Sequence, residues 1–72
     1  MMNQRSVVLS ADEALVLLEW LARHDEAGDL PTANAAEQRA LWNLEAALEK
    51  VVPETLDPGY PELLQQAVAR LS

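Results

Sequence analysis

The 72-residue chain has no cysteine, one histidine and only two glycines. Without cysteine it forms no disulfide and no thiolate metal site, and one histidine leaves no second imidazole ligand. Gly28 and Gly59 stand far apart, so they do not form a glycine-rich phosphate loop. Basic residues are also scarce, with 5 Lys and Arg against 12 Asp and Glu and a net charge of −7. We expect no cofactor, no metal and no direct nucleic-acid binding.

Candidate catalytic groups are few. Ser10 is better explained as a helix cap, and His24 as a cation in the last turn of a helix. Glu45 and Glu49 are four residues apart on a polar helix face, where they read as surface charge rather than as a general acid and base. We therefore expect the protein to have no enzymatic activity.

Long apolar runs are absent as well. No run approaches the roughly 20 apolar residues of a membrane span, and the first five residues lack the apolar core of a signal peptide. We expect a cytoplasmic protein without membrane contact. Residues 1–72 are long enough for one small domain, and a core of this size is commonly reinforced by helix packing or by oligomerisation.

Half of the residues are hydrophobic, and their periodicity predicts three helices. The expected helices span about 11–27, 34–51 and 61–71. Ser10 and Glu13 form a capping box before the first helix, and Gly28 is a suitable C-cap. Asn34 is a candidate N-cap for the second helix, and Pro61 is compatible with the first turn of the third.

These elements predict a mainly α fold, a three-helix domain in which an antiparallel hairpin is followed by a C-terminal helix. The expected core residues are Leu15, Leu18, Leu21, Leu41, Leu44, Leu48, Leu64 and Val68. Before the first helix, residues 5–9 form a short extended arm or strand, because Val7 and Val8 are β-branched. Such a strand would pair with residues 54–56, pair with the same segment of a second copy, or remain an apolar arm.

Two features indicate an interface. The apolar arc of the first helix is roughly 200° wide, which is typical of either a central core helix or half of an interface that includes Leu17 and Trp20. Trp42 points away from the apolar stripe of the second helix, with Arg39 and Ala46 nearby. Its indole is a candidate anchor for a partner, unless residues 7–9 or the proline-rich loop of residues 52–61 cover it.

Several stretches resemble a set of small bacterial proteins of unassigned function. They are residues 9–21, residues 36–50, Asp57-Pro58-Gly59-Tyr60 and the closing segment from Leu64 to Leu71. The resemblance implies a bacterial cytosolic protein and carries over no activity and no site.

We expect a protein–protein interaction module that self-associates, as a homodimer, through the first helix, the Trp42 face, or both. The candidate interface residues are Trp42, Arg39, Ala46, Trp20, Leu17 and Val8. The alternative is an acidic, antitoxin-like inhibitor that caps a basic site on a partner. Steep salt dependence of binding favours the inhibitor, and salt-insensitive apolar association favours the interaction module.

Overall fold

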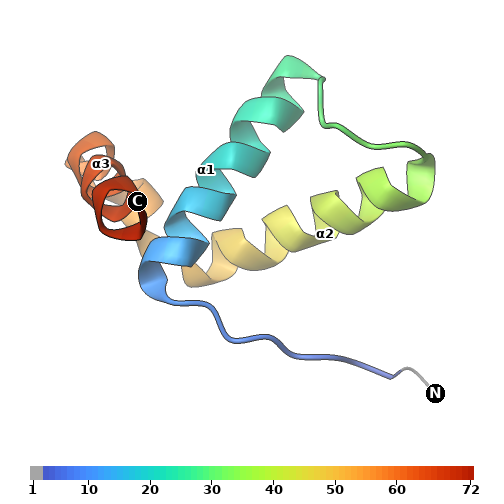
Figure 1. Cartoon of the computed structure of the whole chain (residues 1–72), viewed down its shortest axis with the longest axis horizontal. Coiled ribbons are helices and arrows are strands. Elements are labelled where there is room, and N and C mark those ends of the chain that lie inside the picture. Colours follow the sequence, from blue (N-terminus) through green and yellow to red (C-terminus); the bar gives the residue numbers. More distant parts are fainter. Residues whose placement is uncertain (1–2) are drawn as a thin grey trace.

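The computed structural model describes residues 3–72 and contains three α-helices, with a short 3-10 helix before the last one (Figure 1). The elements are α1 (Ala11–Ala27), α2 (Ala35–Val51), η1 (Pro53–Leu56) and α3 (Tyr60–Leu71). This arrangement confirms the predicted mainly α, three-helix fold. α2 begins one residue later than the sequence predicts, and α3 begins one residue earlier.

Local sequence determines where α1 and α2 begin and where α1 ends. The Ser10 hydroxyl accepts a hydrogen bond from the Glu13 N–H at 3.0 Å, and Glu13 Oε1 accepts one from the Ser10 N–H at 2.8 Å. α1 ends at Gly28, whose φ of 71° lies in the left-handed region that glycine adopts without steric cost. Asn34 caps α2 by accepting a hydrogen bond from the Glu37 N–H at 2.9 Å.

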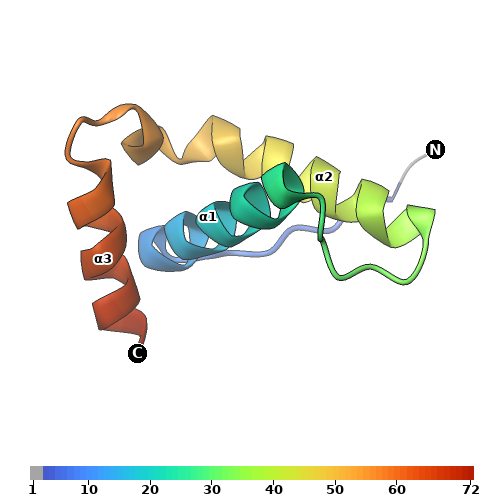
Figure 2. The same ribbon diagram turned by 90° about the horizontal axis from the view of Figure 1, so that it is seen from above.

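The central element is α1, which packs against both α2 and α3. α1 and α2 run in opposite directions and form a V that opens toward the connection between them (Figure 1). α3 lies across the closed end of this V, steeply inclined to both helices (Figure 2). The apolar arc of α1 is wide because this helix has a neighbour on each of two sides.

The buried core is smaller than the sequence predicts. Its members are Ala14, Leu15, Leu18, Leu21, Leu48, Val52 and Ala67. Leu41, Leu44 and Leu64 are only partly buried against this core. Val68 is 45% exposed, so its assignment to the core is wrong. Ala67 is completely buried, and Val68 follows it by about 100° around the helix, which turns its side chain toward solvent.

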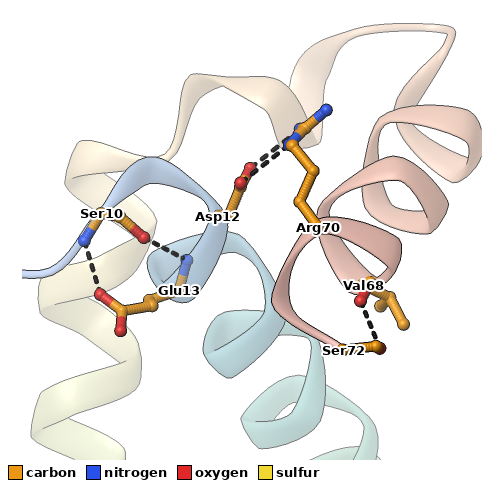
Figure 3. A network of polar contacts seen from close by, with 6 residues as sticks. All are labelled: Ser10, Asp12, Glu13, Val68, Arg70 and Ser72. Atoms are coloured by element: carbon orange, nitrogen blue, oxygen red, sulfur yellow. Dashed lines mark hydrogen bonds and ion pairs between the residues drawn. The ribbon is translucent and has the colours of Figure 1, made fainter.

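One ion pair and one hydrogen bond hold α3 against α1. Near the end of α3, Arg70 binds the Asp12 carboxylate in a bidentate manner, with Nε and Nη2 at 2.8 and 2.9 Å from its two oxygens (Figure 3). At the start of α3, the Tyr60 hydroxyl donates a hydrogen bond to Glu19 Oε1 at 2.8 Å. The two contacts lie at opposite ends of α3 and orient this short helix across α1.

Residues 3–9 form an arm without helix or strand that leaves the start of α1 near the end of α2 and diverges from α2 toward the N-terminus (Figure 1). The predicted strand does not form within the described residues 3–72. Pairing with residues 54–56 is also wrong, because these residues belong to η1. The Cα radius of gyration is 13.3 Å, against about 11 Å for a compact domain of this length, and the extended arm contributes to the difference.

Candidate functional site

A concave apolar surface lies between the arm, the start of α1 and the second half of α2. We call it the arm groove. It has a volume of about 510 Å³. Its lining residues are Val7, Val8, Leu9, Ser10, Ala11, Ala14, Leu44, Ala47, Leu48 and Val51. None of these side chains is charged, although the chain as a whole carries a net charge of −7.

The arm does not fill this groove with its own side chains. Val7 and Val8 line the groove, yet they are 81% and 97% exposed. On the opposite wall, Val51 is 67% exposed. The apolar stripe of α2 is therefore covered by α1 along one edge only, and its other edge remains in water. The groove is therefore an exposed, uncharged apolar surface, and we take it as a candidate interaction site.

The accessible surface of the chain is large for its mass. The chain exposes 5693 Å², whereas a compact monomer of 7.9 kDa exposes about 4,400 Å². The excess is about 1,300 Å², and the arm contributes to it, since Val7 and Val8 are 81% and 97% exposed. Each partner in a standard protein–protein interface buries about 800 Å². The excess is larger than this area, and an extended arm raises the accessible surface whether or not a partner covers it.

A second surface, which we call the Trp42 patch, lies on the other side of α2. It is lined by Asp25, Trp42, Glu45, Ala46 and Glu49. Trp42 is 44% exposed, and its indole Nε1–H donates a hydrogen bond to Asp25 Oδ1 at 2.9 Å. Neither the arm nor the proline-rich loop lines this patch, so Trp42 lies beside the last turns of α1 instead.

The Trp42 patch brings three carboxyl groups close together, those of Asp25, Glu45 and Glu49. Partial burial raises the pKa of the Glu45 carboxyl, and the nearby carboxylates of Asp25 and Glu49 raise it further. Three like charges around one half-exposed indole favour the approach of a cation and oppose the approach of an anion. The arm groove and the Trp42 patch therefore differ in chemistry, one being apolar and the other acidic.

The structure distributes the six predicted interface residues over several places. Trp42 and Ala46 share the Trp42 patch, and Val8 lies in the arm groove. Arg39 is exposed on α2 and lines neither surface. Leu17 and Trp20 are partly buried and pack against the core of their own chain.

Val7, Ala47 and Val51 line the groove, and the sequence pattern did not mark them as interface residues. Ala47 and Val51 belong to the apolar stripe of α2, which reads as core. The exposed edge of this stripe depends on the angle at which α1 crosses α2, and no local pattern contains that angle. The sequence did not decide whether Val7 is exposed, because an unpaired apolar arm was one of the alternatives for residues 5–9.

The remaining polar contacts of α1 have structural explanations. His24 Nδ1 lies 2.8 Å from Asp29 Oδ1, and its ring centroid is 4.4 Å from that of Trp20. These contacts place the imidazole at the C-terminal end of the helix, where a cation is favourable. Within residues 3–72, no group of three or more acidic or histidine side chains is arranged to hold a metal ion.

In the described part of the chain, none of the helices combines the length and the apolar character needed to cross a bilayer. No protein-family model, curated protein or solved structure matches the chain.

Proposed function

We propose that this protein is a non-enzymatic protein–protein interaction module that self-associates through the arm groove. The observation that carries the proposal is an uncharged apolar groove whose wall valines, Val7, Val8 and Val51, lie in water. Full burial of one such side chain contributes about 1.5–3 kcal/mol. A two-fold dimer buries each of these valines once in each chain, so a few valines supply a substantial part of the free energy of association.

Two neighbouring alanines provide the test. Ala47 lines the arm groove and Ala46 lines the Trp42 patch, and both are exposed on α2. We expect the wild type to dimerise in sedimentation or light-scattering experiments over a concentration series. Ala47→Glu is expected to make the protein monomeric at the same helical content, because the charge is buried at the interface. Ala46→Glu should leave the dimer intact.

The opposite result for the two variants would move the interface to the Trp42 patch. A wild type that stays monomeric at every concentration would overturn self-association. The resemblance to small bacterial proteins supports a cytoplasmic, bacterial setting for such a module.

A second candidate function is that of an acidic inhibitor that caps a basic site on a partner. The carboxylates around Trp42 favour it: burial and, after it, the neighbouring carboxylates raise the pKa of Glu45, and a bound cation would offset the repulsion among these carboxylates. The test is a titration of tryptophan emission with a lysine-rich peptide at several salt concentrations. Saturable binding that weakens steeply with salt and is lost in Glu45→Lys supports the inhibitor. Salt-insensitive binding contradicts it.

A further inference from the structure

The arm of each chain forms one wall of its own arm groove but does not fill it. The capping box ties the Ser10 N–H to the Glu13 carboxylate, and Ser10 has an extended conformation with φ −68° and ψ 163°. Leu9 and Ala14 stand at the two staple positions of the helix start, and both line the groove. These contacts set the direction in which the arm leaves α1. Val8 remains 97% exposed in this arrangement.

The arm also has an unpaired backbone. Within residues 3–72, no backbone N–H or C=O of residues 3–9 makes a hydrogen bond to another part of the chain. An extended segment with two adjacent β-branched residues, Val7 and Val8, has a high preference for pairing with another strand. A second extended segment beside the arm would satisfy these groups, and the groove lies at that position.

The charge distribution favours the arm of a second copy as that segment. The arm carries Arg5 and no acidic residue, so its side-chain charge is +1. The chain has a net charge of −7, so residues 10–72 carry −8. A cationic, apolar arm is attracted by the acidic body of another copy, whereas an acidic peptide would be repelled.

We propose that two copies exchange arms, so that residues 3–9 of each chain occupy the arm groove of the other. The proposal rests on the self-association proposed above and specifies its geometry. Each incoming arm lies between α2 and the resident arm, where its valines meet Leu44, Ala47 and Val51. The two arms then run side by side and pair their backbones across the two-fold axis. The exchange would bury exposed apolar side chains of the arm, among them Val7 and Val8.

Substitution in the arm is the first test. Val8→Glu is expected to raise the dimer dissociation constant by about 100-fold or more, since each of two buried valines contributes about tenfold. Leu56→Glu is the matched control, because Leu56 is 89% exposed and lies outside the groove. It should leave the dissociation constant unchanged. If Val8→Glu stays dimeric while Ala47→Glu is monomeric, arm exchange is wrong and self-association through the groove stands.

Cross-linking gives the geometry directly, because the natural chain contains no cysteine. A Val8→Cys chain is mixed with an Ala47→Cys chain and oxidised. Arm exchange predicts a disulfide-linked heterodimer in this mixture. In the control mixture of Val8→Cys with Ala46→Cys, arm exchange predicts no disulfide-linked heterodimer. If the disulfide forms only within a doubly substituted single chain, the arm closes on its own groove and the exchange is overturned. A monomeric wild type would overturn both the exchange and the proposed function.

Discussion

Replacement of Leu21 by alanine tests whether α1 is the centre of the core. Leu21 is 1% exposed, and α1 packs against both other helices. A fully buried Leu→Ala substitution costs about 2–5 kcal/mol, because it removes apolar contacts and leaves a cavity. A domain of 72 residues has a total stability of about 4–10 kcal/mol. The substitution is therefore expected to remove about half of the free energy of unfolding.

The assay is thermal unfolding followed by circular dichroism, at one protein concentration for all variants. A loss of about 3 kcal/mol in a domain of this size lowers the Tm by roughly 12–24 °C. Leu56→Ala is the control, since Leu56 is 89% exposed on η1 and its truncation should change stability by less than about 0.5 kcal/mol. Equal shifts for the two variants would refute the central position of α1.

Three further predictions concern pKa values and backbone conformation. Burial and the hydrogen bond to Glu19 raise the pKa of Tyr60, the only tyrosine, to about 12, so phenolate absorbance should appear near pH 12. The stability that the protonated Tyr60 contributes to the folded state is present below pH 10 and is lost as the pH rises from 10 to 12. The hydrogen bonds from Arg70 lower the pKa of Asp12 below 3.8, so their stabilisation is present above pH 3.8 and is lost as the pH falls through the lower folded-state pKa; acid melts of Asp12→Asn should lack this step. Gly28→Ala should cost about 1–2 kcal/mol in urea unfolding, because an added Cβ meets no atom within 4 Å and only the positive φ of 71° opposes it.

The three helices were predictable because local signals determine them. The capping box at Ser10 and the glycine at position 28 mark the ends of α1 as reliably as its apolar periodicity marks the middle. The core was less predictable, because burial depends on how helices cross. Ala67 is completely buried although alanine has little apolar surface, and Val68 beside it is exposed. The steep inclination of α3 to α1 decides which of the two faces the core.

The arm groove shows the same limit. Its α2 residues were recognised as one apolar stripe, yet the exposed edge of that stripe follows from the V formed by α1 and α2. The arm was predicted as extended. Residues 54–56 lie in η1, so they do not offer the arm a strand to pair with. Trp42 was correctly separated from the apolar stripe, whereas its bond to Asp25 joins residues 17 positions apart and has no local signature.

The bond between Asp12 and Arg70 joins residues 58 positions apart, so the beginning of α1 and the end of α3 lie together. A mechanical force that pulls residue 10 away from residue 72 first loads the contact between Asp12 and Arg70. It separates α3 from α1 one contact at a time, because the contacts are loaded in sequence rather than in parallel. The pull then reaches the closed end of the V, where α1 and α2 meet. The protein is therefore expected to unzip at low force in two steps, with α3 released first.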